Sequence, residues 1–527
     1  MAKGDSRMAA KLEREDMALN NDIPWPDIDE ARTRVLKLQR KLHQWAKDDK
    51  ERRFKDLYNL VYDRATLVVA WGRVRKNRGS RTAGVDGKTR AHVEQNNGVR
   101  GFLESIRTSL KAGIFQPLPV REKGIPKAGG KTRYLGIPTL RCRVIQMALK
   151  LVLEPIFEED FYPISYGYRP GRRAQDAIAQ IAHFINPPSS YEYAIEGDIK
   201  GCFDNIDQGV LLNLVRTRIQ DRKVLTLIKA FLRAGVMKET GGFASTLTGS
   251  PQGGIISPIL CNVYLSVLDR HFEQAWSYQT RYIGCTTYYR RRGYATYRMV
   301  RYADDFVILV RGSREQAQTI RDEAATVIHD ELKMELSAEK TLITHVDEGF
   351  DFLGHHIRRV PWKGKLVAWT YPSKKSLEAI KHKVKSLTTR STTHLSLKVL
   401  LLSLNPVLRG WATYFRYDAS KRTLAYVDHF TWWRVFRWLR KKHPSRTYKY
   451  LRKRYCDDRW QIREEGVELF RPARVTVERY RYRGERILLP WMDPEELGPV
   501  GRFAQYQLDD TLYLEALDNS LFDSPDR

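Results

Sequence analysis

Hydrophobic and polar positions divide the chain into segments of three kinds. Near the N-terminus, apolar residues recur at helical spacing between Val35 and Trp45, which predicts an amphipathic packing helix. From about residue 100 to residue 360, short strand-like runs alternate with helical runs, as is typical of a mixed α/β domain. Helical spacing returns between Leu377 and Leu387, with lysines on another face of the same predicted helix.

Composition makes nucleic acid the first candidate partner. The 527 residues include 91 Lys plus Arg against 62 Asp plus Glu, a formal net charge of +29, and so basic a balance is typical of proteins that bind a polyanion. With 42% hydrophobic residues the chain can build packed cores, and its length predicts about two to four domains. Residues 371–460 hold 22 Lys plus Arg, 5 Asp plus Glu and 15 aromatic residues, whereas residues 493–527 hold 9 acidic and 2 basic residues.

Several classes of protein are excluded by the pattern of cysteines and apolar runs. The five cysteines are far apart in the sequence and form no C-x-x-C pair, which argues against a disulfide scaffold or a zinc ribbon. No apolar stretch approaches the roughly 18 residues that a membrane span needs, and residues 1–12 lack the apolar core of a signal peptide. We expect reduced thiols in a cytoplasmic setting and no membrane partner.

Two strand-like runs end in carboxylates. The pattern over Val300–Val310 predicts a hairpin with Asp304 and Asp305 at its turn, and Tyr193–Asp198 is a second run that ends in Asp198. An Asp-Asp turn on the surface is the plain alternative. If the strands lie side by side, Asp198 and Asp304 face each other and can hold two Mg²⁺ ions roughly 3.5–4 Å apart, the geometry for in-line attack at phosphorus. One ion would activate a 3′-hydroxyl while the other holds a triphosphate.

Three nearby features carry weaker signals. Phe203 lies five residues after Asp198, where a flat ring would block a ribose 2′-hydroxyl, although a core aromatic is the alternative. The glycine-rich loop 249–254 precedes a helical pattern and would let backbone approach a nucleotide closely. Residues 127–138 predict a basic hairpin, which is either solvated or placed to clamp the β and γ phosphates. Its cations are Lys127, Lys131 and Arg133.

Taken in chain order, these segments resemble the reverse transcriptase/maturase proteins encoded by group II introns. The matching stretches are TAGVDG at 82–87, KTRYLGIP at 131–138, SYGYRPGR at 165–172, GDIKGCFDN at 197–205, SPQGG at 250–254, YADD at 302–305, LSAEKT at 336–341 and FLG at 352–354. So many motifs in the right order are far more specific than any one of them. Many such proteins end in a zinc-coordinating HNH endonuclease, but Cys456 stands alone after residue 450, so we expect the form without that module.

The resemblance implies an α+β right-hand polymerase, with fingers and a palm with an antiparallel sheet, followed by an α-helical thumb/maturase domain. The metal-binding positions that it implies are Asp198, Ile199, Asp304 and Asp305, and the three aspartates are the catalytic residues. The implied nucleotide-binding positions are Lys127, Arg133, Phe203, Gln252, Arg169 and Lys340. Because all three carboxylates are present, the sequence gives no sign of a dead polymerase.

On this basis the chain divides into five parts. They are an N-terminal helical extension of the fingers (1–100), the fingers and palm (101–365), the thumb/maturase domain (366–460), a small β-rich addition (461–492) and an acidic tail (493–527). Within the thumb, a helix is expected to begin at Asn405-Pro406. The run 290–292 is either a phosphate contact or a solvated loop. The expected RNA-binding cations of the thumb are Lys381, Lys385, Arg409, Arg434, Arg437 and Lys441.

The expected function is RNA-directed DNA synthesis joined to binding of the intron RNA, which would assist splicing and intron mobility. The implied partners are group II intron RNA, an RNA template with a DNA primer, a DNA target, dNTPs and two Mg²⁺ ions, with a homodimer left open. Two alternatives stay open as well. One is a domesticated reverse transcriptase that serves defence or repair, and the other is an RNA-binding splicing factor whose polymerase site is unused.

Overall fold

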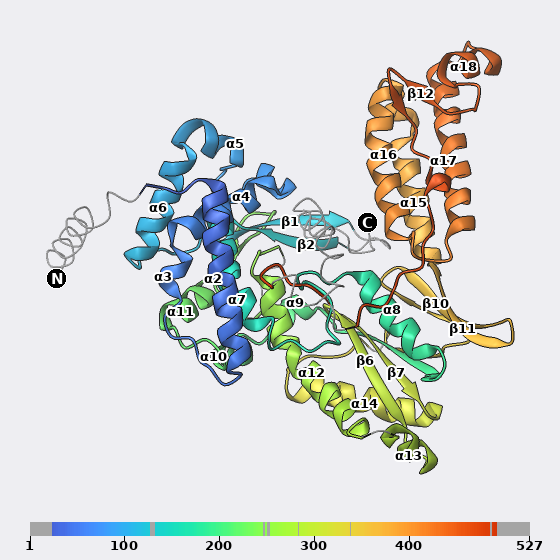
Figure 1. The fold of residues 1–527 in the computed structure, drawn as a ribbon. Helices are drawn as coiled ribbons and strands as arrows, with labels where there is room; N and C mark the ends of the chain where they lie inside the picture. The colour runs from blue at the N-terminus through green and yellow to red at the C-terminus, as the bar shows by residue number, and fades with distance from the viewer. Residues whose placement is uncertain are drawn as a thin grey trace.

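The computed structural model describes residues 24–126, 132–245, 248–249, 253–282, 284–337, 339–484 and 487–492, and it consists of three bodies. A helical fingers region with a small sheet comes first, then a palm built on an antiparallel sheet, then a helical thumb (Figure 1). The palm joins the other two bodies. Across the described ranges, none of the helices combines the length and apolar character needed to span a bilayer.

The fingers region is organised around one buried helix. Its helices are α2 (Ile28–Asp48), α3 (Tyr58–Val61), α4 (Arg64–Lys76), α5 (Arg90–His92), α6 (Val99–Lys111) and α7 (Leu140–Phe157), with the short η1 (Arg78–Arg81) and η2 (Val93–Asn97). Helix α7 is buried along nearly its whole length, so it needs neighbours all round. Helices α2 and α4 pack against it. The predicted N-terminal helix is thus confirmed as α2, which begins after Asp27, a side-chain cap on its first turn.

A four-stranded sheet with the order β2-β1-β4-β5 completes the fingers. Its strands are β1 (Val120–Pro126), β2 (Thr132–Ile137), β4 (Val236–Met237) and β5 (Phe243–Ala244). Strands β1 and β2 are antiparallel, with Arg121 opposite Ile137 and Pro126 opposite Thr132. This confirms the predicted basic hairpin, whose turn at 127–131 lies outside the described residues.

The palm sheet has the order β6-β7-β3-β8, and each neighbouring pair is antiparallel. Its strands are β3 (Tyr193–Asp198), β6 (Thr296–Tyr302), β7 (Asp305–Arg311) and β8 (Leu342–His345). The palm helices are α8 (Ala174–Ile185), α9 (Cys202–Asn205), α10 (Gln208–Arg216), α11 (Arg222–Leu232), α12 (Ser257–Gln279), α13 (Cys285–Arg291) and α14 (Arg314–Asp330). Along β7, Phe306, Ile308 and Val310 enter one core while Val307 and Leu309 enter another, so both faces of the sheet are covered.

The thumb is a bundle of three long helices joined to the palm by a second sheet. The sheet comprises β9 (Phe350–Phe352), β10 (His355–Trp362) and β11 (Lys365–Pro372), and the helices are α15 (Lys374–Leu387), α16 (Leu397–Tyr414), α17 (Lys421–Lys442) and the shorter α18 (Tyr448–Tyr455). The expectation that a helix begins at Asn405-Pro406 is wrong, because α16 runs through Pro406 without a break. The buried stripe from Leu400 to Leu408 packs into the thumb core on both sides of the proline. The stabilisation from that packing outweighs the loss of the backbone hydrogen bond that the proline removes.

Residues 461–492 differ from the small β-rich addition that we expect from the sequence. Among the described residues of this range, only the two-residue strands β12 (Arg463–Glu464) and β13 (Val467–Glu468) form, followed by η5 (Pro472–Arg474). The remainder, here called the C-terminal strap, comprises residues 475–484 and 487–492 and has no regular structure. Val475–Tyr482 has the residue types of a strand but pairs with no other strand in the described part of the chain. Its Glu478 N–H donates to the Arg416 carbonyl of the thumb, and its Tyr480 hydroxyl donates to Oδ1 of Asp176 in the palm.

The C-terminal strap contacts all three bodies. The backbone N–H of Glu478 donates to a carbonyl in the loop after α16 of the thumb. Arg483 then donates through two nitrogens to the Asp176 carboxylate on α8, at 2.8 and 2.6 Å. At the far end, Arg40 of α2 donates to the carbonyl of Trp491, whose side chain is 2% exposed. The strap therefore ties the thumb to the palm and the fingers.

We expect Arg483→Met to lower the free energy of unfolding by about 2 kcal/mol, because the change leaves the 1%-exposed Asp176 carboxylate without its ion-pair partner. The exposed neighbour Arg481 provides the matched control, and Arg481→Met should leave stability within about 0.5 kcal/mol. Urea unfolding followed by tryptophan fluorescence measures both. Equal effects of the two substitutions would show that the ion pair does not anchor the strap.

Candidate active site

The antiparallel pairing of β3 with β7 brings the predicted carboxylates to one edge of the palm sheet. Asp198, the last residue of β3, lies opposite Asp305, the first residue of β7. In the hairpin of β6 and β7, Tyr302 pairs with Asp305, so Ala303 and Asp304 form the turn. The backbone of Ala303 is left-handed, with φ of 58°. The predicted hairpin and the predicted neighbouring strands are both confirmed.

The surroundings of Asp304 oppose the negative charge of its carboxylate. Burial raises the pKa of Asp304, the nearby charge of Asp198 raises it further, and the charges of Arg133 and Arg301 lower it. The ammonium of Lys340 lies 2.9 Å from Oδ2 of Asp198, so a cation already sits against one of these carboxylates. Two like charges that lie close together in half-buried surroundings are stabilised most by a multivalent cation between them.

A divalent cation fits these residues by charge and by donor type. Carboxylate oxygens are the ligands that Mg²⁺ prefers, and Asp198 already accepts a hydrogen bond from a cation, the Lys340 ammonium. The side chain of Ile199 is a hydrocarbon and is buried, 2% exposed. Its backbone carbonyl is therefore the group of this residue that has the chemistry of a metal ligand. In the described part of the chain no three acidic, histidine or cysteine side chains are grouped as a ready metal site.

Arg301 supports the catalytic turn from inside the palm. Its side chain is fully buried and donates to both oxygens of Asp269, at 2.6 and 2.5 Å. Its other N–H groups donate to Asn262 Oδ1, to the Ala303 carbonyl and to Ser165 Oγ, at 3.1, 2.7 and 2.8 Å. The hydrogen bond to Ala303 ties the turn that carries Asp304 to helix α12. The sequence did not indicate this role of Arg301, because its position in a strand before the carboxylates does not show that its guanidinium is buried and makes five hydrogen bonds.

A close backbone approach holds the same turn from another side. Gly167 packs so tightly on Ala303 that a Cβ added there would overlap the Ala303 backbone nitrogen. The Gly167 carbonyl accepts from Nδ2 of Asn262 at 2.8 Å, and Asn262 also bonds Arg301. The glycine of the SYGYRPGR stretch is therefore required by packing against the catalytic hairpin.

Two aromatic rings lie beside the carboxylates. Phe203 is the second residue of α9 and is 7% exposed. Its ring lies edge-on to the ring of Tyr168, with 6.2 Å between the ring centres. Tyr168 has a left-handed backbone with φ of 59°, and burial together with the Asp304 charge raises its pKa. Tyr168 is thus a site residue that the sequence did not single out, because only the fold brings its ring to Asp304. Beneath Phe203, Sγ of Cys202 lies 3.8 Å from Sγ of Cys261, with both thiols buried.

The other predicted nucleotide-binding residues differ in how close they lie to the carboxylates. Burial raises the pKa of both Asp304 and Asp204, and Arg133 lies near enough to each for its charge to oppose that rise. Arg169, by contrast, is 6% exposed, and its guanidinium is bonded to Glu158 and to the carbonyls of residues 161, 162 and 165. All five of its N–H groups are used there, so the structure gives Arg169 a role in the core and no support to the predicted nucleotide contact. Lys127 and Gln252 lie outside the described residues.

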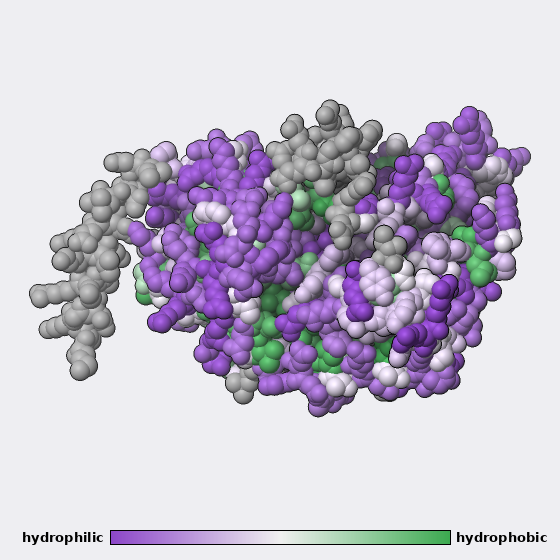
Figure 2. All heavy atoms as spheres, turned by 60° about the horizontal axis from the view of Figure 1, so that its bottom comes forward, coloured by the Kyte–Doolittle hydropathy of each residue, from purple (hydrophilic) through white to green (hydrophobic). Residues whose placement is uncertain are grey.

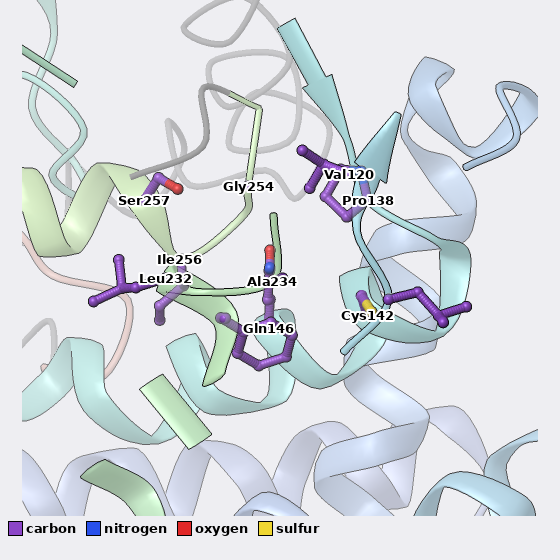
Figure 3. A pocket seen from close by; sticks show the side chains of 11 residues that line it. Val120, Pro138, Cys142, Gln146, Leu232, Ala234, Gly254, Ile256 and Ser257 are labelled. Atoms are coloured by element: carbon purple, nitrogen blue, oxygen red, sulfur yellow. The ribbon is translucent and has the colours of Figure 1, made fainter. Parts of the chain in front are cut away.

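A cavity of about 10 Å³ marks where the glycine-rich loop meets the fingers (Figure 3). It lies among Val120 and Pro138 of the fingers, Gln146 of α7, and Gly254 and Ser257 beyond the loop. Oε1 of Gln146 accepts from the backbone N–H of residue 255 at 2.7 Å. A space of this size holds about one water molecule, so this is a joint between elements rather than a ligand pocket.

Comparison with known proteins identifies the family to which the chain belongs. The family described as reverse transcriptase (RNA-dependent DNA polymerase) matches residues 125–357, and the family described as group II intron, maturase-specific domain matches residues 377–456. Protein YkfC of Escherichia coli (strain K12) is 35% identical over 340 residues, which cover 62% of this chain and 88% of that protein. The chain belongs to the group II intron reverse transcriptase/maturase family.

Other members of this family match over part of their length. Group II intron-encoded protein LtrA of Lactococcus lactis subsp. cremoris is 34% identical over 353 residues, which cover 58% of this chain and 57% of LtrA. The putative COX1/OXI3 intron 2 protein of Saccharomyces cerevisiae is 26% identical over 343 residues, 58% of this chain and 39% of that protein. The chain thus spans little more than half the length of LtrA. A solved telomerase from Candida albicans aligns at 12% identity over 67% of each chain with a TM-score of 0.34, too low a similarity to carry an argument.

The maturase-specific domain contains the six expected RNA-binding cations, and they differ in exposure. Lys381 pairs with Glu378 at 2.7 Å, and Arg434 donates to the carbonyl and hydroxyl oxygens of Thr388. These two therefore have partners within the thumb. The side chains exposed to a partner are those of Lys385, Arg409, Arg437 and Lys441.

We expect Arg301→Lys to lower the rate of nucleotide addition by about ten- to a hundredfold, because lysine keeps the charge beside Asp269 but loses the fork that holds the Ala303 carbonyl. Arg298→Lys is the matched control on the same strand, since Arg298 is 7% exposed and donates to Glu273 at 2.9 Å. Single-turnover primer extension separates the rate from the dNTP KM, and denaturant unfolding compares the two stabilities. A rate unchanged in Arg301→Lys, or lowered equally in both variants, would contradict a positioning role.

Proposed function

We propose that the protein is an RNA-directed DNA polymerase in which Asp198, Asp304 and Asp305 hold two Mg²⁺ ions and which acts on an RNA template, a DNA primer and dNTPs. When bound, the ions supply Lewis-acid stabilisation of negative charge at the reacting phosphorus. The observation that carries the proposal is the convergence of the three carboxylates where β3 and β7 pair, at a place where burial and a neighbouring charge raise the pKa of Asp304. A site that opposes its own negative charge in this way favours a bound cation.

The residues around the carboxylates bind and orient the substrates in this proposal. Arg133 on the fingers strand β2 lies within electrostatic reach of Asp304, a position from which a guanidinium fork holds triphosphate oxygens. The rings of Phe203 and Tyr168 wall the same space and restrict which sugar fits beside the carboxylates. The Lys340 ammonium lies 2.9 Å from Oδ2 of Asp198, a position beside the carboxylates from which it would also contact a phosphate of the substrate. Ile199, Lys127 and Gln252 keep the roles that the resemblance implies.

The second part of the proposal is binding of a group II intron RNA, which would assist splicing and intron mobility. It is supported by the maturase-specific domain at 377–456 and by the exposed cations Lys385, Arg437 and Lys441, whose charge suits phosphate. The name of LtrA describes that relative as group II intron-encoded. A DNA target for mobility, a homodimer, and a cytoplasmic location with the nucleoid or ribonucleoprotein belong to the same proposal.

We expect Asp304→Asn/Asp305→Asn to lower Mg²⁺-dependent extension of a DNA primer on an RNA template by at least about a thousandfold, because two charged metal ligands are lost. Asp322→Asn/Asp330→Asn removes the same charge from exposed positions on α14 and should extend the primer normally. Filter binding of structured RNA should be equal in all three proteins. Full extension by the Asp304/Asp305 variant, or none by the unaltered protein while it still binds RNA, would overturn the polymerase proposal and favour the splicing-factor alternative.

A further inference from the structure

An exposed group of tyrosines and arginines surrounds α13 at the end of the palm remote from the catalytic turn. This group, here called the α13 patch, comprises Tyr278, Arg281, Tyr282, Tyr288, Arg291, Arg292 and Tyr294. Its four tyrosines are 57, 49, 45 and 60% exposed in that order. Large rings gathered in one exposed place are unusual on a protein without a partner there, and neither the carboxylate site nor the maturase-specific domain accounts for them.

Three of the four tyrosine rings of the α13 patch are held together by a central tyrosine, Tyr289. The ring of Tyr289 lies 6.0 Å from that of Tyr278 at the end of α12, 6.1 Å from that of Tyr288 on α13, and 6.0 Å from that of Tyr294 ahead of β6. Three separate segments therefore present their rings as one fixed group. A surface whose rings are already ordered loses little side-chain entropy when it binds.

Arginines are interleaved with these rings. The guanidinium carbon of Arg281 lies 4.1 Å from the centre of the Tyr278 ring, and that of Arg292 lies 4.9 Å from the centre of the Tyr288 ring. Arg290 is different, because its Nε donates to Thr296 Oγ1 at 3.0 Å and anchors α13 to the palm. The sequence left the run 290–292 open between a phosphate contact and a solvated loop, and the fold assigns Arg290 to structure and leaves Arg291 and Arg292 exposed.

The charge of this region selects the class of partner. Residues 274–303 contain six arginines and no Asp or Glu, and the three that are exposed are Arg281, Arg291 and Arg292. Among the described residues, Arg281, Arg291 and Arg292 form no ion pair with a carboxylate. Figure 2 brings this end of the palm forward, and the face there is largely hydrophilic without one continuous apolar surface. Flat rings among uncompensated arginines suit bases and phosphates better than an apolar protein face.

The α13 patch is too far from the carboxylates to touch the reacting nucleotide. Strand β6 separates them, with the patch ahead of Thr296 and the catalytic turn after Tyr302. Seven residues of strand span about 20 Å. A nucleic acid bound at the patch would therefore be held in addition to the primer terminus.

We propose that the α13 patch binds the unpaired bases of a folded RNA, with the tyrosine rings stacking on bases and Arg291 and Arg292 contacting the flanking phosphates. Unpaired bases are the part of a structured RNA that aromatic side chains reach, whereas paired bases are already stacked on one another. This inference deepens the proposed RNA-binding function and rests on it. The patch adds a second RNA surface to that of the maturase-specific domain.

The test compares two variants of the full chain with the unaltered protein. Tyr278→Ala/Tyr288→Ala removes two stacking rings, and Arg291→Gln/Arg292→Gln removes two phosphate contacts. Arg222→Gln/Lys229→Gln is the charge-matched control, at exposed positions on α11. The probes are a fluorescent RNA stem-loop with an unpaired loop and a fully paired RNA duplex, each titrated over a range of salt concentrations. Circular dichroism and primer extension on a short paired template check that each variant is folded.

The ring variant should bind the stem-loop about tenfold or more weakly and the duplex as the unaltered protein does, because stacking requires unpaired bases. The arginine variant should lower the slope of log affinity against log salt by about 1.5, and the control on α11 should bind the stem-loop normally. Primer extension should be unchanged throughout.

Equal stem-loop binding by the ring variant and the unaltered protein would overturn the inference. So would loss of self-association in the ring variant with RNA binding intact, which would make the patch an interface between copies of the chain. Failure of the proposed function has a different signature, namely no RNA binding by the unaltered protein.

Discussion

The catalytic turn rests on the buried ion pair between Arg301 and Asp269. Both side chains are completely buried, and a charge removed from water is tolerated only when it is paired and fully hydrogen-bonded. Arg301 meets that condition by using all its donors, and one of them holds the carbonyl of Ala303. The Asp304 carboxyl is therefore carried by a rigid support rather than by a free loop. Like charges that repel one another stay together only on such a support.

The three bodies are joined by long-range contacts as well as by the chain itself. The C-terminal strap leaves the thumb, pairs with Asp176 of the palm and ends against α2 of the fingers. The thumb therefore has a second connection to the polymerase domain besides the strands β9 to β11. A thumb tied in this way moves less freely than one on a single hinge, which favours a fixed distance between the carboxylates and the RNA-binding surface.

Positive charge has two separate uses in this protein. Arg301, Arg169 and Arg483 are bonded to buried or nearly buried carboxylates and hold elements together. Others, such as Arg437 and Arg291, remain exposed, and their charge suits a phosphate partner. The net charge of +29 points to a polyanionic partner, but it does not tell which arginine meets that partner. That is why Arg169, predicted at the nucleotide, lies in the core instead.

Local patterns in the sequence were sufficient for the elements that carry the chemistry. The alternation on either side of Asp304 predicts the hairpin, the run ending at Asp198 predicts its neighbour, and the spacing near Val35 predicts α2. Each depends on residues close together in the chain, where periodicity and turn chemistry decide the backbone. The motif order then predicts the family and the right-hand fold.

Only the tertiary structure decided what lies around those elements. It buried Arg169, brought Tyr168 to Asp304, carried α16 through Pro406 and laid the residues after 474 along the palm as a strap instead of a sheet. In each case the outcome depends on a partner far away in the sequence, and the residue types alone fit more than one partner. Patterning fixes which residues become buried or form a strand, but packing and charge pairing over long distances choose their neighbours.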